Sequence, residues 1–180
     1  MPDEGQRTYL FAAIDRATRW VSVAILKDKS AASASGFFKR LIDQAPFTIT
    51  KVLTDNGKEF TDRFCATGQR QPTGGAHAFD HVRADNHIEH RLTKPATPQT
   101  NGMIERFNDR IADVLHTNQF DSSASLQVTL KRFVCLYNHH IQQKNLHHKT
   151  PLQTLQRWYA QQPQLFKKFH VIIRNPTTTL

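Results

Sequence analysis

The segment Tyr9-Leu-Phe-Ala-Ala-Ile-Asp15 is a short apolar run that ends on a carboxylate. A second apolar run, Trp20–Leu26, is rich in β-branched residues, and the polar stretch Arg16–Arg19 between the two suits a hairpin turn. The sequence therefore predicts two antiparallel strands. Because the first strand is almost wholly apolar, we expect it to be central in its sheet.

Helical and strand-like patterns alternate after this hairpin. Ser30 can cap a helix whose apolar residues recur at helical spacing through Ala45, and Pro46 would end that helix. Residues 47–53 are strand-like again and lead into Thr54-Asp55-Asn56-Gly57, where Asn-Gly favours a turn. A second strand thus delivers a carboxylate to its C-terminal end.

The middle of the chain is weakly patterned. Residues 58–64 fit a short helix, but residues 65–86 combine Gly and Pro with little periodicity, which predicts a loop. Residues 87–92 are strand-like, and residues 93–102 form a polar connector that contains proline.

The C-terminal half is helical in pattern. Apolar residues recur at helical spacing over residues 102–120, after Ser122-Ser123, and after Thr150-Pro151, where Thr can cap and Pro suits the first helical position. Residues 171–173 could add one short final strand. Strands followed by helices predict an α/β domain over residues 1–160, with residues 161–180 as a C-terminal extension.

The charge balance is strongly basic. The chain has 24 Lys and Arg against 15 Asp and Glu, a net charge of +9 and a pI near 9.9. Such a balance favours polyanionic partners, because neutralising phosphates releases counterions, although a basic but ordinary soluble protein also fits. No segment reads as a signal peptide, and no apolar run approaches the roughly 20 residues that a membrane span needs. We expect a cytoplasmic protein with no membrane partner.

Three carboxylates stand out by their contexts. Asp15 and Asp55 each end an apolar strand, and Glu105 lies in the first turns of a long helix. If the three converged, their mutual repulsion would be relieved by a hard divalent cation such as Mg²⁺, which prefers oxygen ligands. In a basic protein, such a pocket suggests phosphoryl transfer on nucleic acid. Taken singly, each Asp fits a turn former or a helix cap more readily than a metal ligand.

The blocks around these carboxylates are Ala12-Ala-Ile-Asp15-Arg-Ala-Thr-Arg-Trp20, Leu53-Thr-Asp55-Asn-Gly-Lys-Glu-Phe60 and Pro98-Gln-Thr-Asn-Gly-Met-Ile-Glu105-Arg-Phe-Asn108. In this order they resemble the integrase core domain of the retroviral integrase and bacterial transposase superfamily. With Ile88-Glu-His-Arg-Leu-Thr-Lys-Pro95, they look most like the integrase-like transposases of bacterial insertion sequences. The resemblance covers most of residues 8–158.

The resemblance implies an RNase H-like fold, a five-stranded mixed sheet with helices on both sides. It also implies a DDE triad, Asp15, Asp55 and Glu105, that is both catalytic and metal-binding and holds two Mg²⁺ or Mn²⁺ ions. Such a site hydrolyses DNA at element ends and then joins the freed 3′-hydroxyl to target DNA. Family members act as multimers, so the resemblance implies a homo-oligomer on DNA. The interval between Asp55 and Glu105 is longer than in the shortest family members, and the excess lies in residues 65–86.

Five further residues are candidate DNA contacts. Backbone N–H groups at a helix start favour phosphate, and basic side chains beside the expected pocket could hold phosphates too. These candidates are Lys94, Gln99, Asn101, Arg106 and Arg110. For each of them, simple capping or a solvated charge remains an alternative.

Other functions stay open from sequence alone. The chain could be an inactive DNA-binding remnant of a truncated insertion-sequence transposase, because the first strand begins near Thr8 and leaves no room before it for an end-binding helix-turn-helix. A different metal nuclease on the same fold, such as an RNase H, is a third possibility, which the block at residues 100–107 disfavours. Histidines gather at residues 77–90 and 139–148. Without cysteines at zinc-ligand spacing, this pattern favours exposed histidines near DNA over a zinc site.

Overall fold

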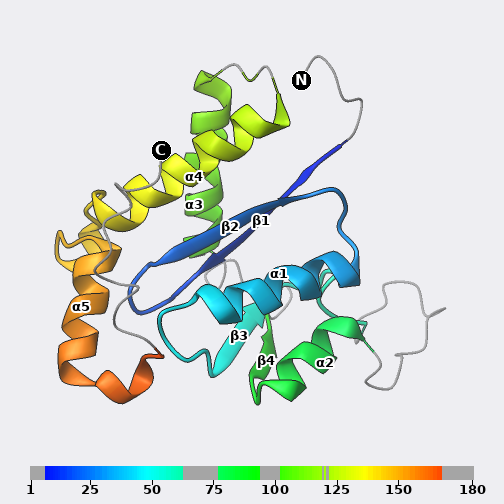
Figure 1. Cartoon of the computed structure of the whole chain (residues 1–180), viewed down its shortest axis with the longest axis horizontal. Helices are drawn as coiled ribbons and strands as arrows, with labels where there is room; N and C mark the ends of the chain where they lie inside the picture. Colours follow the sequence, from blue (N-terminus) through cyan, green and yellow to red (C-terminus); the bar gives the residue numbers. More distant parts are fainter. Residues whose placement is uncertain (1–6, 63–76, 94–101, 119, 121, 168–180) are drawn as a thin grey trace.

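In the computed structural model, helices pack around two short β-ladders (Figure 1). The structure describes residues 7–62, 77–93, 102–118, 120 and 122–167. An antiparallel hairpin joins β1 (Tyr9–Ile14) to β2 (Val21–Leu26), and a parallel ladder joins β3 (Lys51–Thr54) to β4 (Glu89–Leu92). The predicted hairpin and α/β class are confirmed. The described residues contain four strands, so the five-stranded sheet stays a prediction.

Helices make up most of the rest. They are α1 (Ala31–Gln44), α2 (Ala78–Asp85), α3 (Gly102–Thr117), α4 (Ser123–His139) and α5 (Pro151–Gln161), with short 3₁₀ turns η2 (Lys144–Leu146) and η3 (Pro163–Leu165). Ser30, Ser122 and Thr150 each accept a backbone N–H from the third residue of the following helix, which confirms the predicted caps at Ser30 and Thr150. Among the described residues, no helix is long and apolar enough to cross a membrane.

Two local predictions are wrong. Residues 78–85, placed in a loop, form α2, which buries Phe79 and Val82. Phe79 and Val82 are the only large apolar residues of this short helix, too few to show a helical period. Of the predicted helix over residues 58–64, the described residues form only one turn, in which the N–H groups of Phe60 and Thr61 donate to the Gly57 carbonyl. The proposed final strand at residues 171–173 lies outside the described residues.

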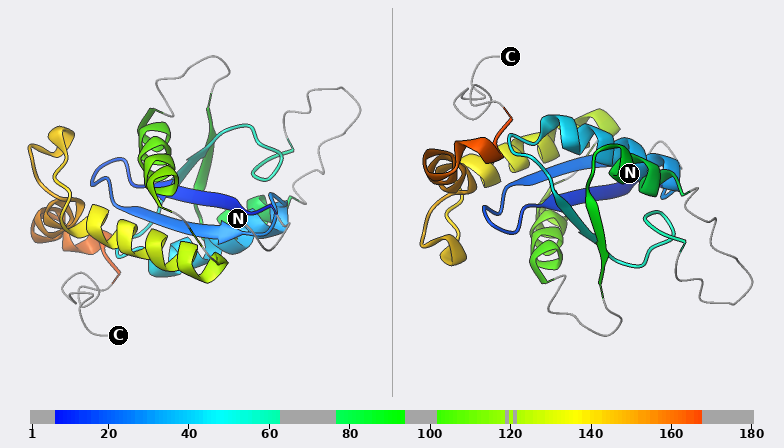
Figure 2. Two further views of the ribbon diagram at one scale, coloured as in Figure 1. Left: turned by 90° about the horizontal axis from the view of Figure 1, so that it is seen from above. Right: turned by 90° about the horizontal axis from the view of Figure 1, so that it is seen from below.

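The hairpin separates two hydrophobic clusters. Side chains alternate along a strand, so Phe11 packs toward α1 and α2, whereas Leu10, Ala12 and Ile14 pack toward α3 and α4. Figure 2 shows α1 and α3 on opposite sides of the hairpin. Because both faces are covered, an uninterrupted apolar run is the sequence that such a strand requires.

The residues after α5 return to the body of the domain. The N–H of Thr48 donates to the Leu165 carbonyl at 2.7 Å, and the N–H of Lys167 donates to the Pro46 carbonyl at 2.9 Å. The Nζ of Lys167 also donates to the Ile42 carbonyl at 2.9 Å. The described part of the predicted C-terminal extension is therefore attached to the connection between α1 and β3.

A buried asparagine in α4 holds the outer edge of the hairpin. The Oδ1 of Asn138 accepts the Val21 N–H, and its Nδ2 donates to the Val21 carbonyl, both at 2.9 Å. Both the asparagine and the valine are buried. The backbone groups of Val21 thus point away from β1, which makes Ile14 and Val21 a non-hydrogen-bonded pair of the ladder.

We expect Asn138→Ala to lower the free energy of unfolding by about 3 kcal/mol, because it leaves two buried backbone groups without partners. Chemical denaturation monitored by circular dichroism measures this loss. The control is Asn145→Ala, an exposed position where a change within about 0.5 kcal/mol is expected. Equal losses in the two variants would contradict the role given to Asn138.

Candidate functional site

A groove of about 900 Å³ lies between β1 and β3. Its walls include every residue from Leu10 to Arg16 and every residue from Thr48 to Asp55. Neighbouring side chains of a strand point to opposite faces of the sheet, so one face presents only every second residue. Consecutive residues can all line the same groove only where the groove runs along the edge of the strand. The groove therefore runs between two strand edges, with Phe38 of α1 and Ile104 of α3 among the residues that cover it.

Asp55 lies at the exit of β3, at one end of this groove. Its Oδ1 accepts the Gly57 N–H at 2.9 Å, and Glu59 lines the same end. A Cβ added to Gly57 would lie 2.7 Å from the Glu59 Oε2 and 2.9 Å from the Asp55 Oδ1. Two carboxylates therefore converge on the space that this glycine leaves empty. The Asp-Asn-Gly-Lys-Glu sequence contained this signal, but Glu59 was not among the predicted site residues.

The backbone beneath Asp55 is held by a buried histidine. The Thr54 hydroxyl donates to the Asp55 carbonyl at 2.9 Å, and it lies 2.8 Å from the Nε2 of His90. Because a hydroxyl has one proton, the His90 Nε2 must be the donor in the second bond. The imidazole is fully buried, with its Nδ1 3.7 Å from the Oδ1 of Asp80. The sequence favoured an exposed histidine near DNA, or less readily a zinc ligand, and the burial of His90 shows that the expected exposure is wrong at this position.

Asp15 occupies the turn of the hairpin. Its Oδ2 accepts both the N–H and the hydroxyl of Thr18, at 2.8 and 2.7 Å. Its backbone N–H donates to the Trp20 carbonyl, and its carbonyl accepts the Arg19 N–H. These hydrogen bonds are typical of an aspartate that stabilises a turn. A turn-forming role was the alternative to metal binding that the sequence left open for Asp15.

Aromatic contacts fix the direction of the hairpin relative to β3. Trp20, beside the hairpin turn, packs on Phe47, which precedes β3, with ring centroids 5.7 Å apart. Phe11, nearer the start of β1, packs on Phe60, which follows β3, at 6.2 Å. The strands β1 and β3 therefore run in opposite directions.

Asp15 and Asp55 consequently line opposite ends of the groove. The six residues of β1, at about 3.3 Å each, lie between those ends. Glu105 is exposed on α3, where its neighbours Ile104 and Asn108 line the groove. Within the described residues, no three His, Cys, Asp or Glu side chains form a group that could hold a metal ion. The structure therefore does not bring Asp15 together with Asp55.

The carboxylates other than Asp15 have the ligand chemistry that a divalent cation requires. Asp55, Glu59 and Glu105 offer the oxygen ligands that Mg²⁺ and Mn²⁺ take. Asp55 is exposed and uses one oxygen for the Gly57 N–H, so its carboxylate is oriented before any ion arrives.

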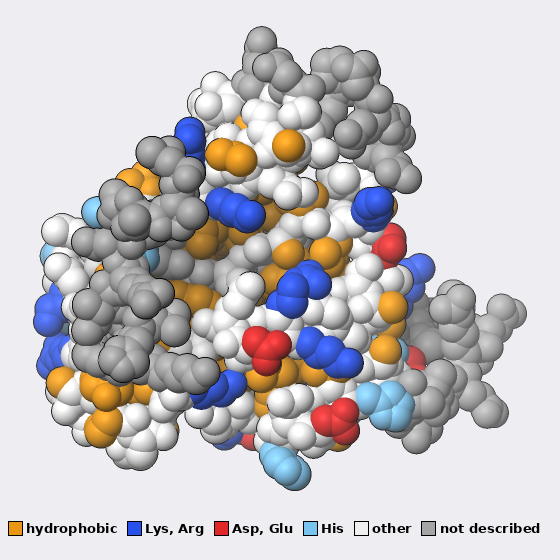
Figure 3. Space-filling model, viewed as in Figure 1, with side chains coloured by type: hydrophobic (Ala, Val, Ile, Leu, Met, Phe, Trp, Pro, Cys, Tyr) orange, Lys and Arg blue, Asp and Glu red, His pale blue; other side chains and the backbone are white. Residues whose placement is uncertain are grey.

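Two of the five predicted DNA contacts lie within the described residues. Lys94, Gln99 and Asn101 lie outside the described residues. Arg106 and Arg110 are exposed on α3, and the guanidinium of Arg110 lies 5.8 Å from the centroid of the Tyr137 ring. On the face seen in Figure 3, Lys and Arg side chains are scattered rather than gathered in one patch.

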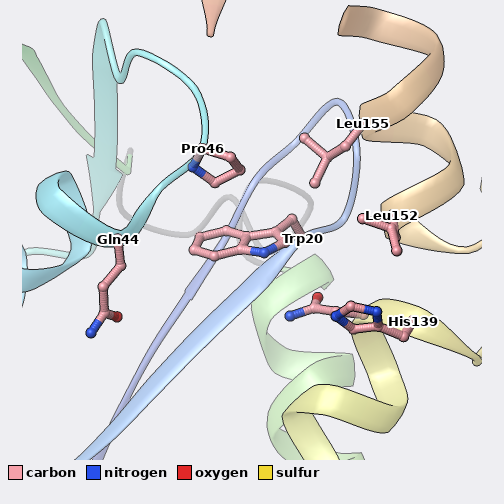
Figure 4. Close-up of a pocket in the computed structure, with 7 residues that line it drawn as sticks. Trp20, Gln44, Pro46, His139, Leu152 and Leu155 are labelled. Carbon is pink, nitrogen blue, oxygen red and sulfur yellow. The ribbon is translucent and has the colours of Figure 1, made fainter. Parts of the chain in front are cut away.

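A second, smaller cavity lies where the hairpin turn meets α4 and α5 (Figure 4). Trp20, Pro46, Asn138 and His139 are among its lining residues, and its volume is about 70 Å³. Ligand pockets commonly measure about 300–1,000 Å³, so this cavity is a packing feature. Burial lowers the pKa of His139, and the neighbouring His140 lowers it further.

Two family profiles, each described as an integrase core domain, match residues 1–98 and 86–151. The chain belongs to the integrase core domain family. It is also 26% identical over 155 residues to ORF3 of Spiroplasma virus SpV1-C74, a candidate integrase. That match covers 83% of this chain but only 42% of the viral protein, so the chain spans less than half of this relative's length.

Solved structures of integrases share the fold. The catalytic core domain of BIV integrase aligns with a TM-score of 0.59 and 19% identity, covering 86% of this chain and 90% of that one. The HTLV-2 integrase core in complex with magnesium, in its dimeric form, gives 0.57 and 20%, covering 81% and 82%. The simian T-cell lymphotropic virus intasome with PP2A regulatory subunit B56 gamma gives 0.62 and 19%, covering 95% and 53%. These similarities confirm the predicted RNase H-like fold.

We expect Gly57→Ala to weaken Mn²⁺ binding about 10-fold, because the added methyl group must displace the carboxylates of Asp55 and Glu59. Isothermal titration calorimetry measures the affinity. Only the ends of flexible side chains must move, so the unfolding midpoint should change little. Gly36→Ala, within α1 and without a close neighbour, is the control and should bind Mn²⁺ normally. Unchanged affinity in Gly57→Ala would exclude this pair of carboxylates as ligands.

We expect the depressed pKa of His139 to make stability fall as the pH drops. An imidazole whose folded pKa lies below its unfolded value of about 6.5 contributes stability above that value and loses it as the pH falls through the folded pKa. His139→Gln should therefore lose less unfolding free energy between pH 7.5 and pH 5 than the parent does. The matched control is His116→Gln, at an exposed site. Equal pH dependence in parent and His139→Gln would contradict the assignment.

Proposed function

We propose that the chain is the catalytic core of a metal-dependent DNA-joining enzyme of the integrase and transposase type, a polynucleotidyl transferase. The observation that carries the proposal is the integrase core domain match over residues 1–98 and 86–151. It is supported by Asp55 and Glu59, which converge where a groove opens at the exit of β3. The net charge of +9 suits a DNA substrate.

In this proposal, Asp55 and Glu105 are catalytic metal ligands, and Glu59, which converges with Asp55 beside Gly57, is a further ligand. Two Mg²⁺ or Mn²⁺ ions would activate the attacking hydroxyl and stabilise the leaving oxygen. The Gly57 N–H orients the Asp55 carboxylate, while Thr54 and His90 hold the backbone beneath it. Asp15, the third member of the expected triad, is proposed instead to stabilise the hairpin turn, because its Oδ2 accepts two hydrogen bonds from Thr18.

The proposed partners are element ends and target DNA, bound by an oligomer of the chain. Support comes from the relatives, which include an intasome and a dimeric integrase core. Arg106 and Arg110 are proposed to contact DNA phosphates from α3, together with Lys94, Gln99 and Asn101. Similarity to the transposases of bacterial insertion sequences remains part of this proposal.

A second candidate is an inactive DNA-binding remnant of a truncated transposase. The observation in its favour is that the described residues assemble no group of three metal-binding side chains. Such a remnant would keep the fold and the basic surface and would bind DNA without joining it.

Mn²⁺-dependent strand transfer on a branched oligonucleotide tests the proposal, since this substrate does not require recognition of an element end. We expect Asp55→Asn and Glu105→Gln to reduce the rate at least about 1,000-fold, because each loses a metal ligand. Asp15→Asn should keep both activity and stability, since an asparagine oxygen can accept the same turn bonds. Asp43→Asn, at an exposed site on α1, is the control.

Each outcome distinguishes the candidates. Loss of activity in Asp15→Asn without a change in the unfolding midpoint would restore Asp15 to the active site. An inactive parent that still binds DNA favours the remnant. Cleavage of RNA in an RNA–DNA hybrid, without joining, would replace the proposal by an RNase H activity.

A further inference from the structure

Two arginines lie close to one tyrosine beside the hairpin turn. Arg19 lies in the connection between β1 and β2, Arg110 lies on α3, and Tyr137 lies on α4. The guanidinium of Arg110 is 5.8 Å from the centroid of the Tyr137 ring. Burial raises the pKa of the Tyr137 hydroxyl, and the positive charges of Arg110 and Arg19 oppose this rise, so both guanidinium groups are near the phenol. We call these three residues the two-arginine cluster.

The packing of the hairpin on α3 and α4 holds this cluster together. Asn138, the residue after Tyr137, bonds to the backbone of Val21, which lies two residues after Arg19. Tyr137 also packs on Phe107 of α3, with ring centroids 5.0 Å apart. Val21, Phe107 and Tyr137 belong to one buried hydrophobic cluster, so the two-arginine cluster borders a packed core.

The described residues do not neutralise either arginine of the cluster. The Nη1 of Arg19 is buried, and none of them accepts a hydrogen bond from it. Neither Arg19 nor Arg110 forms an ion pair with a described carboxylate, although Asp113 lies one helical turn after Arg110. Because buried polar groups are almost always hydrogen-bonded, the cluster is a set of donors that lacks an acceptor.

The backbone of Arg19 is a second, independent observation. Its φ is 62°, in the left-handed region that favours glycine. An arginine in this conformation stabilises the turn less than a glycine would. Its presence there favours a role for its side chain.

We propose that the two-arginine cluster binds a phosphate group of a DNA backbone. The planar N–H donors of a guanidinium match the oxygens of a phosphate, and the Tyr137 hydroxyl can donate a further hydrogen bond. Arg110 follows Glu105 on α3 by about 7.5 Å along the helix axis, so one DNA molecule can contact both the cluster and the proposed metal site. The choice of DNA rests on the proposed function, whereas the phosphate site rests on the cluster alone.

NMR of the arginine Nε–Hε groups, with inorganic phosphate titrated at constant ionic strength, tests the site. In the parent we expect the signals of Arg19 and Arg110 to shift until they saturate. Arg19→Gln and Arg110→Gln should each weaken phosphate binding at least about 10-fold, because each loses hydrogen bonds from a charged group. The double variant should lose less than the product of the two factors, since both arginines hold one ligand. Arg157→Gln, at an exposed site on α5, is the control and should bind phosphate normally.

Arg19→Gly separates binding from folding. Glycine adopts the left-handed backbone without strain, so the unfolding midpoint should be unchanged or higher. The affinity for phosphate should nevertheless fall by the same factor as in Arg19→Gln. A loss of binding in a chain that is no less stable cannot come from misfolding.

The salt dependence of binding to a short DNA duplex tests the source of the phosphate. Combining Arg19→Gly with Arg110→Gln should reduce the slope of log Kobs against log salt concentration by about 0.9 in magnitude, the value for one lost phosphate contact. Arg157→Gln should keep the slope of the parent. Fluorescence anisotropy of a labelled duplex at several salt concentrations measures it.

Three results would overturn the proposal. The absence of a saturable shift at Arg19 would exclude the phosphate site, and equal phosphate affinity in parent and Arg19→Gly would place the site elsewhere. Phosphate binding with an unchanged DNA salt slope in the double variant would exclude the DNA backbone and leave a free phosphate compound as the ligand. None of these measurements uses DNA joining, so an inactive chain that binds DNA through the cluster would contradict the proposed activity alone.

Discussion

Burial of the β1–β2 hairpin on both faces is the constraint from which the rest of the structure follows. One face supports the cluster of α1 and α2, and the other supports the cluster of α3 and α4. Neither cluster could form if the register slipped by one residue, because every side chain would then change face. The bonds from Asn138 to Val21 fix the hairpin against α4 and so fix that register.

The same hairpin decides which carboxylates can act together. Its direction places the Asp15 turn at the entry of β3, where Trp20 packs on Phe47. Asp55 lies at the exit, with Glu59 beside it and with α3 bordering the groove. Asp55 and Glu59 supply two carboxylates at the C-terminal end of β3. A site with three would need a further carboxylate from another segment that reaches this end of the groove.

Sequence reasoning succeeded where the signal is local. The caps at Ser30 and Thr150, the hairpin and the long amphipathic helices each depend on residues within a few positions of one another. The helix α2 was missed because Phe79 and Val82 are its only two apolar side chains that are fully buried. The integrase blocks identified the family, because each spans several consecutive residues.

The site was harder to predict because its geometry is not local. Asp15 and Asp55 have the same context in the sequence, an apolar run followed by a carboxylate. What separates them is the direction of β1 relative to β3, and that direction depends on contacts between distant residues. His90 was overlooked for a similar reason, since its bond to Thr54 joins two strands that are far apart in the chain.

The contrast between the two ladders has a consequence for the order of folding. The hairpin joins neighbouring segments through a short turn, whereas β3 and β4 pair only after the long connection that contains α2 has closed. Closing a longer loop loses more conformational entropy before the contacts that compensate for this loss have formed. The hairpin should therefore form early, and the ladder that positions Asp55 should form late. The part of the domain that carries the proposed chemistry is then the part that a destabilised chain loses first.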